Sequence, residues 1–193
     1  TVSGKPLAES SLPHTLRARV CLAIRLPVLK RCPIFEPCPQ VLKKAIALYL
    51  TPEIYSAGDL VVEYGDRGEA MYFLVRGTVQ VVAENGLTIY ATLKAGSFFG
   101  EGASFSNVRR MASIKCTGFS ESLRLARIDV QNQLRAFCSD EQLLIKKFNS
   151  ITARNQERNA AIQNNLQIAR IPGSRLYRIV QYIHTDNTVG DTI

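Results

Sequence analysis

The sequence predicts an α+β domain that is mainly β, in which a run of short strands is flanked by helices. From residue 51 to residue 128, apolar and polar residues alternate with a period of two. Within this region a turn signal recurs roughly every 8–12 residues. Before and after it, apolar residues recur at helical spacing. Such a pattern indicates a β-sandwich, a barrel or a roll.

The central region, residues 51–128, is expected to contain only short strands. Gly77 separates two of them as a bulge or tight bend. Asn85-Gly86 is the strongest hairpin signal in the chain. The segments predicted to be strands are 54–55, 60–64, 71–75, 78–82, 87–93, 111–117 and 122–128.

Residues 1–50 are expected to form a linker and two helices. The first helix should run from Leu12-Pro13 to Leu29, since proline fits a helix start. Pro27 should stop or kink this helix, because it lacks the N–H group that a helix interior needs. The second helix covers residues 40–50, with one apolar face and with Lys43 and Lys44 off that face.

Residues 129–170 are expected to form two further helices, followed by a tail over residues 171–193. Asp129 is predicted to cap a helix over residues 130–137. Ser139 and Gln142 have the spacing of a capping box, so a long helix should follow to about residue 169. The tail is too short for a second domain and holds a possible small helix over residues 176–183.

Composition limits the class of protein. The 193 residues are enough for one sizeable domain with flanking helices. A net charge of +8 favours anionic partners such as nucleotides, acidic proteins, lipid headgroups or nucleic acid. No apolar run is long enough to predict a membrane span. The five cysteines lack a Cys-x-x-Cys spacing, which favours free thiols in a reducing compartment. Because the chain starts at Thr1 rather than Met, we expect a piece of a longer protein.

The segment from residue 96 to residue 114 carries the chemistry that distinguishes this chain. Gly100 and Gly102 bracket Glu101 and allow the backbone to approach a ligand closely. A helical turn starting near Ala103 would present unpaired N–H groups to an anion. Arg110 adds a planar cation that can bind two phosphate oxygens at once. This set suits a small ligand with one phosphate and nearby hydroxyls.

No catalytic motif accompanies this segment. The two histidines, His14 and His184, lie in the flanks. The sequence lacks a P-loop, a zinc-protease motif, a nucleophile elbow and the third glycine of a dinucleotide fingerprint. We therefore expect a binding domain rather than an enzyme, with no cofactor or metal.

The same segment resembles a known family. Phe99-Gly100-Glu101, with Arg110 nine residues after the glutamate, is similar to the phosphate-binding cassette of cyclic-nucleotide-binding domains. The run 109–113, Arg-Arg-Met-Ala-Ser, is especially similar to the cassettes of cyclic-nucleotide-regulated cation channels. The glycine pattern over residues 58–79 and the Leu-Pro-x-x-Leu-Arg run at 12–17 extend the likeness. The resemblance covers about residues 30–165.

The resemblance implies both a fold and a set of binding residues. The fold would be an eight-stranded antiparallel β-roll, jelly-roll-like, with N-terminal helices and C-terminal hinge and lid helices. Arg110 would hold the cyclic phosphate together with backbone amides of Gly100, Gly102 and Ala103. Glu101 would hold the ribose 2′-hydroxyl. The ligand would be cAMP or cGMP.

Two further groups of residues would contact the purine. The pocket wall would consist of Val81, Ile89, Ala91, Met111 and Ala112. In the channel family the residue after the arginine is usually threonine and helps to bind cGMP, so Met111 favours cAMP. The lid would contribute Ile151, Asn155, Arg158 and Asn159, where the apolar stripe of the long helix becomes polar. The alternative is that this stretch is simply solvated.

The resemblance implies a regulatory domain at the cytoplasmic face of a membrane. Lid closure would act through the N-terminal linker helices on the gate of a tetrameric channel, with no nucleic-acid partner. The alternatives are a kinase regulatory subunit, a membrane transporter or exchanger, and a ligand-free interaction domain of a channel relative. A transcription factor is disfavoured because the tail is too short for a helix-turn-helix.

Overall fold

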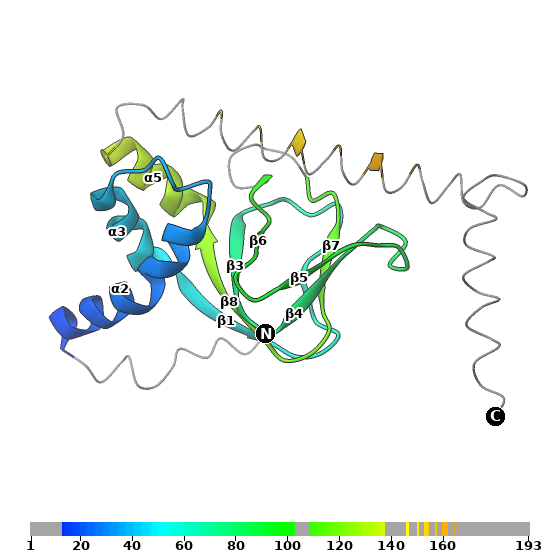
Figure 1. Cartoon of the computed structure of the whole chain (residues 1–193), viewed down its shortest axis with the longest axis horizontal. Coiled ribbons are helices and arrows are strands. Elements are labelled where there is room, and N and C mark those ends of the chain that lie inside the picture. Colours follow the sequence, from blue (N-terminus) through cyan, green and yellow to red (C-terminus); the bar gives the residue numbers. More distant parts are fainter. Residues whose placement is uncertain are drawn as a thin grey trace, which may run out of the picture. The chain divides into compact units, whose positions relative to one another are not determined.

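The computed structural model describes residues 13–102 and 109–137, together with single positions between 146 and 164 (Figure 1). The chain divides into two compact units, residues 1–152 and 153–193. Every described position between 146 and 164 is helical and exposed, in agreement with the long helix expected there. The expected capping box at Ser139, the lid residues and the tail helix lie outside the described residues.

The first unit contains the named helices and strands. The helices are α2 (His14–Arg31), α3 (Gln40–Tyr49) and α5 (Arg127–Phe137). The strands are β1 (Thr51–Tyr55), β2 (Leu60–Val62), β3 (Ala70–Arg76), β4 (Thr78–Val82), β5 (Ile89–Lys94), β6 (Phe98–Phe99), β7 (Ser113–Cys116) and β8 (Ser120–Ala126). Among the described residues, none of the helices has the length and apolar character needed to cross a membrane.

The eight strands form two four-stranded sheets. One sheet has the order β1-β8-β3-β6 and the other has the order β2-β7-β4-β5. Every pair is antiparallel, and β1 lies beside β8, so the ends of the strand region meet in one sheet. The predicted eight-stranded antiparallel roll with N-terminal helices is confirmed.

Strand β3 separates two hydrophobic clusters, because successive side chains of a strand point to opposite faces. Its residues Ala70, Tyr72 and Leu74 belong to the cluster between the two sheets, with partners on β2, β4, β6 and β7. Tyr72 stacks on Phe99 there, with ring centroids 5.3 Å apart. Met71 and Phe73 face the other way, toward the helices. One strand therefore joins the interior of the roll to the helical layer.

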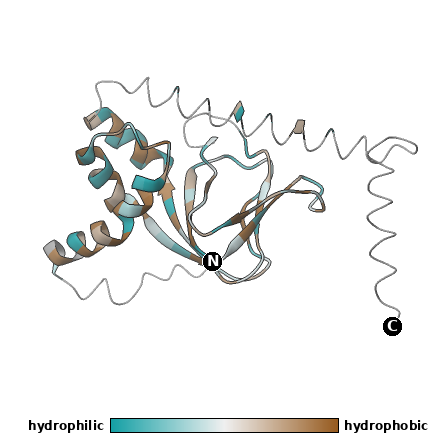
Figure 2. Cartoon of the chain, viewed as in Figure 1, coloured by the Kyte–Doolittle hydropathy of each residue, from teal (hydrophilic) through white to brown (hydrophobic). Residues whose placement is uncertain are grey.

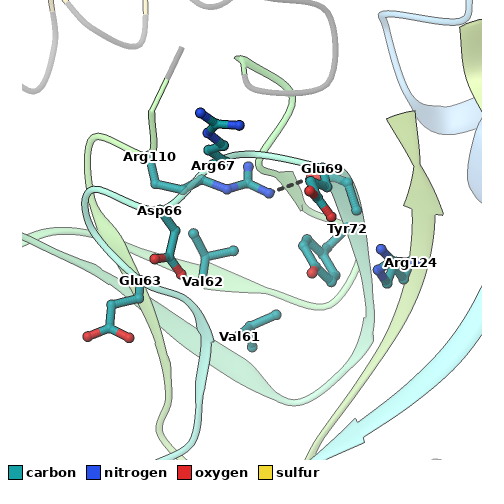
Figure 3. Close-up of a pocket in the computed structure, with 10 residues that line it drawn as sticks. Val61, Val62, Glu63, Asp66, Arg67, Glu69, Tyr72, Arg110 and Arg124 are labelled. Carbon is teal, nitrogen blue, oxygen red and sulfur yellow. Dashed lines mark hydrogen bonds between the residues drawn. The ribbon is translucent and has the colours of Figure 1, made fainter. Parts of the chain in front are cut away.

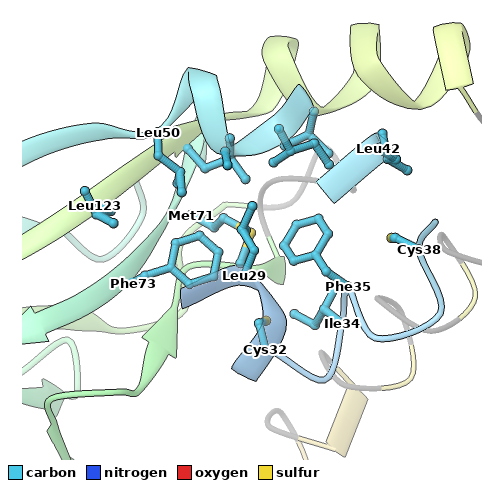
Figure 4. Packing of buried hydrophobic residues seen from close by; sticks show 14 of the residues in the cluster. Leu29, Cys32, Ile34, Phe35, Cys38, Leu42, Leu50, Met71, Phe73 and Leu123 are labelled. Carbon is cyan, nitrogen blue, oxygen red and sulfur yellow. The ribbon is translucent and has the colours of Figure 1, made fainter. Parts of the chain in front are cut away.

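The helical layer packs on the outer face of the first sheet. Phe35, Leu29 and Leu42 are almost fully buried against Met71 and Phe73 (Figure 4). Burying an aliphatic or aromatic side chain of this size contributes about 1.5–3 kcal/mol. Figure 2 shows that hydrophobic residues occur in the helices as well as in the strands. This layer packs on the face of β3 and β8 that points away from the interior of the roll.

The first helix differs from its prediction. It was expected to end at Leu29 and to stop or kink at Pro27, but α2 does not stop there and continues to Arg31. A kink at Pro27 stays a prediction. Proline removes one hydrogen bond from a helix interior. Packing offsets that loss here, because Leu29 is fully buried and Leu26 and Val28 pack against the same cluster. Tertiary contacts thus override the local preference of the proline.

Several element boundaries also differ from their predictions. Strand β7 starts at Ser113, so Met111 and Ala112 precede it. Strand β8 spans 120–126 rather than 122–128, and α5 begins at Arg127, which places Asp129 in the first helical turn rather than at the cap. The two-residue strand β6 was not predicted, since so short a run has no detectable alternation.

The predicted hairpin at Asn85-Gly86 is confirmed. Strands β4 and β5 pair on either side of it, and the Ala83 amide donates to the Thr88 carbonyl at 2.8 Å. The Asn85 side-chain oxygen accepts hydrogen bonds from the amides of Leu87 and Thr88, each at 3.0 Å. The side chain therefore caps its own turn, as asparagine commonly does.

Gly77 connects β3 in one sheet to β4 in the other. Its φ of +92° lies in the left-handed region. A Cβ atom there would lie 2.5 Å from the Phe119 carbonyl oxygen and 2.8 Å from the Ser120 Cα. Both the backbone angle and the close approach of the neighbouring segment therefore require glycine.

We expect Gly77→Ala to lower the free energy of unfolding by about 2–5 kcal/mol. The left-handed backbone costs an alanine about 1–2 kcal/mol, and the crowding adds about 1–3 kcal/mol. Gly58→Ala is the matched control, because Gly58 has a φ of +91° and nothing within 4 Å of its added Cβ. Chemical denaturation of both variants measures the difference. Equal losses would contradict the role assigned to the Phe119–Ser120 contact.

Candidate functional site

The backbone of Arg110 is held by the loop between β2 and β3. The Arg110 amide donates to the Asp66 carbonyl, and the Gly65 amide donates to the Arg110 carbonyl, both at 2.8 Å. Beside this pair, Arg67 and Arg109 form an isolated antiparallel bridge. Both the amide and the carbonyl group of Arg110 are thus hydrogen-bonded, which fixes its main chain independently of its side-chain contacts.

The Arg110 side chain runs into the protein and is 9% exposed. Its Nη2 donates to the Ala70 carbonyl at 2.7 Å, which is the dashed line in Figure 3. Its Nη1 donates to the Gly100 carbonyl at 2.9 Å. Burial lowers the pKa of Arg110 below the usual arginine value, while the nearby Tyr72, Glu101 and Asp66 partly offset that effect. Within the described part of the chain, the guanidinium is therefore a buried cation hydrogen-bonded to two carbonyl groups.

Gly100 lies directly against this guanidinium. Its φ is +78°, and a Cβ atom on it would lie 2.8 Å from Nη1 of Arg110 and 3.2 Å from the Ala70 oxygen. Only glycine leaves room for the arginine at this point. Glu101, the next residue, is 7% exposed, and Gly102 is half-buried. Ala103, predicted to complete the phosphate cradle, lies outside the described residues.

A cavity of about 170 Å³ adjoins Arg110. Its described lining contains three arginines and three carboxylates, so its formal charges balance. Arg110 is the predicted site residue that appears in this lining. The lining residues are Val61, Val62, Glu63, Asp66, Arg67, Glu69, Ala70, Tyr72, Arg110 and Arg124 (Figure 3).

Arg124, another arginine of the cavity lining, lies on β8. Its Nε lies 3.7 Å from a carboxylate oxygen of Glu53, and both side chains are partly exposed. Tyr55 donates a hydrogen bond to the same carboxylate. Burial, and then this hydrogen bond, raise the pKa of the Tyr55 hydroxyl well above its usual value. The Arg124 charge is thus already matched within β1 and β8.

The predicted purine-wall residues lie away from the described lining of this cavity. Val81, Ala91 and Ala112 are half-buried, and Val81 packs against the cluster between the sheets. Ile89 is 48% exposed and Met111 is 41% exposed. Their contacts with a base stay a prediction. The predicted lid residues Ile151, Asn155, Arg158 and Asn159 lie outside the described part of the chain.

Sequence reasoning missed the residues that position Arg110. The Ala70 carbonyl and the Gly65-Asp66 backbone lie about forty residues earlier in the chain. The glycine pattern that includes Gly65 and Gly68 pointed to the family likeness but not to a contact with Arg110. Arg109 is exposed, and its Nη1 donates to the Gly65 carbonyl at 2.7 Å. Arg109 thus binds the loop between β2 and β3, and the same loop is hydrogen-bonded to the main chain of Arg110.

Neither metal-binding nor disulfide chemistry is visible in the described residues. No group of three or more His, Cys, Asp or Glu side chains there could hold a metal ion. Cys21, Cys32, Cys38 and Cys116 are buried and form no disulfide. Burial raises the pKa of the Cys32 thiol to about 11, so this group is a poor nucleophile.

Comparison with known proteins identifies the family. Residues 52–137 match the family model of the cyclic nucleotide-binding domain. The chain is 36% identical over 142 residues to cyclic nucleotide-gated channel alpha-4 of Mus musculus, covering 70% of this chain and 25% of that protein. It is 35% identical over 141 residues to cyclic nucleotide-gated channel alpha-2 of Bos taurus, covering 69% and 21%. The chain thus spans about a quarter of the length of these relatives.

A solved structure shares the fold. The chain matches "cAMP bound PfPKA-R (141-441)" with a TM-score of 0.61 and 21% identity, covering 78% of this chain and 49% of that one. The motif around Gly100, Glu101 and Arg110, the two-sheet roll and these matches agree with one another. This chain therefore belongs to the cyclic nucleotide-binding domain family and is related to the channel alpha subunits.

Proposed function

We propose that this chain binds a cyclic nucleotide and that the Arg110 guanidinium receives the cyclic phosphate. The observation that carries the proposal is the environment of that side chain. It is 9% exposed, yet its two hydrogen bonds go to carbonyl groups, which satisfy donors without supplying a full negative charge. Since arginine keeps its proton at ordinary pH, an anion would stabilise this buried cation. Charge-assisted, two-pronged hydrogen bonds to a phosphate would do so.

The neighbouring cassette residues would hold the rest of the ligand. Glu101 is buried beside Arg110 and would accept a hydrogen bond from the ribose 2′-hydroxyl. The amides of Gly100, Gly102 and Ala103 would complete the phosphate cradle. The base would contact the wall formed by Val81, Ile89, Ala91, Met111 and Ala112. The lid residues Ile151, Asn155, Arg158 and Asn159 would close over it.

Binding would then regulate a larger protein. The chain spans about a quarter of channels whose names include cyclic nucleotide gating, and its first helices would connect it to the remainder of such a channel. We place the domain at the cytoplasmic face of a membrane and within a tetramer. Lid closure would act on the gate. The free energy available for this cannot exceed the difference in ligand binding free energy between the lid-closed and lid-open states.

The structure offers a short route for such a signal. The Ala70 carbonyl accepts a hydrogen bond from the Arg110 side chain. The adjacent Glu69 carbonyl accepts a hydrogen bond from the Arg127 amide at 2.7 Å. Arg127 is the first residue of α5, the helix after the roll. A ligand that moved Arg110 would therefore act on a peptide segment that also holds α5. This contact supports coupling between the cassette and the C-terminal helices.

We expect Arg110→Glu to abolish measurable binding of cAMP and cGMP at micromolar ligand. Losing the partner of a buried phosphate should cost roughly 2–5 kcal/mol, which is about a 30-fold to 5000-fold loss of affinity. The measurement is calorimetric titration. Arg76→Glu is the matched control, since Arg76 is exposed at the far end of β3. Wild-type affinity in a folded Arg110→Glu variant would refute the assignment.

We expect Gly100→Ala to weaken cyclic nucleotide binding by about 10-fold to 100-fold. The added Cβ would displace the Arg110 guanidinium, and a misplaced charged hydrogen bond costs about 1.5–3 kcal/mol. Gly86→Ala is the control, because Gly86 also has positive φ but nothing lies near its added Cβ. The same titration compares the two. A loss of affinity no greater than in Gly86→Ala would show that Gly100 does not position Arg110.

We expect Met111→Thr to raise the affinity for cGMP relative to cAMP by about twofold to tenfold. A threonine hydroxyl at this place would offer the guanine a hydrogen bond, which contributes about 0.5–1.5 kcal/mol. Met111 is 41% exposed, so the change should leave the fold intact. Titration of both nucleotides into both proteins gives the ratio. An unchanged ratio would remove Met111 as the basis for a cAMP preference.

A further inference from the structure

Arg67 occupies a defined place beside the proposed phosphate site. It lies in the loop between β2 and β3 and forms an isolated antiparallel bridge with Arg109. The main-chain bonds of Gly65 and Asp66 to Arg110 fix the same loop. Arg67 and Arg110 both line the cavity, and Figure 3 shows them together above it. Two short backbone segments therefore carry Arg67, Arg109 and Arg110, and two of these arginines line the cavity.

The three arginines differ in what they already contact. Arg110 is buried and bonded to two carbonyls, and Arg109 is bonded to the Gly65 carbonyl. Arg67 is exposed and has no hydrogen bond or ion pair with another residue of the described part of the chain. Like charges placed opposite each other on neighbouring strands repel. The same concentration of positive charge attracts an approaching anion.

We propose that Arg67 is a steering residue, which speeds the arrival of the anionic ligand without fixing it once bound. This inference rests on the proposed binding of a cyclic nucleotide. The described cavity lining holds three arginines and three carboxylates. Because Glu53 already matches the Arg124 charge, Arg67 and Arg110 face the three carboxylates, and loss of Arg67 would leave Arg110 alone against them. The larger excess of negative charge would oppose the approach of a phosphate. Arg67 is therefore the exposed cation that partly offsets Glu63, Asp66 and Glu69 in the cavity that the buried Arg110 lines.

Exposure decides which rate constant Arg67 controls. An exposed charge at the rim of a binding site changes the association rate and its salt dependence, whereas a buried, hydrogen-bonded charge changes the dissociation rate. Arg67 is exposed and Arg110 is buried. The two arginines should therefore have separable kinetic effects.

The test is stopped-flow binding of a fluorescent cAMP analogue to wild type, Arg67→Gln and Arg76→Gln. Arg76→Gln removes the same charge from an exposed position at the other end of β3. At about 0.01 M salt we expect Arg67→Gln to lower the association rate constant by about twofold to fivefold relative to Arg76→Gln. The dissociation rate constant should stay unchanged. At about 1 M salt, where the Debye length is about 3 Å, the difference should disappear.

Arg67→Lys tests whether charge alone is responsible. Lysine keeps the charge but loses the planar fork of arginine, so steering predicts a wild-type association rate. The inference is overturned if Arg67→Lys is as slow as Arg67→Gln, or if Arg67→Gln behaves like Arg76→Gln. It is also overturned if only the dissociation rate changes. If wild type binds no nucleotide, the proposed function fails first, which is a separate result.

Discussion

The bonds from the Arg110 guanidinium to the carbonyls of Gly100 and Ala70 are the interaction on which the rest of the site depends. They join the cassette to the start of β3 across the interior of the roll. Burying a cation is costly unless it is hydrogen-bonded and matched by opposite charge. The carbonyls supply hydrogen bonds, and Tyr72, Glu101 and Asp66 contribute favourable charge that partly offsets the effect of burial on the pKa of Arg110. The fold therefore maintains an arginine that is buried and oriented.

Strand β3 is the element that makes this arrangement rigid. Met71 and Phe73 anchor it to the helical layer, and Tyr72 and Leu74 anchor it to the interior of the roll. With both faces packed, the Ala70 carbonyl is presented at a fixed position. The neighbouring Glu69 carbonyl is bonded to the first amide of α5. Arg110, the first sheet and the helix after the roll thus meet at the adjacent residues Glu69 and Ala70.

Most of the fold could be predicted because most of its elements follow from local sequence patterns. Alternation along residues 78–82 and the turn at Asn85 depend on neighbours within a few residues, and both predictions were confirmed. Pro27 and β6 depend on distant partners. The helix passes Pro27 because Leu29 is buried by other elements, and Phe98-Phe99 is a strand because β3 pairs with it. Neither fact has a local signature.

The site divides in the same way. Gly100, Glu101 and Arg110 could be chosen from one short motif, because the spacing of their chemistry is local. The residues that orient Arg110 contribute mostly main-chain atoms, and every residue type except proline offers the same amide and carbonyl. A sequence motif cannot mark Ala70 or Asp66 as partners, since their side chains are not what binds. A motif search therefore finds the group that would touch the ligand, while the groups that hold it in place appear only when the chain is folded.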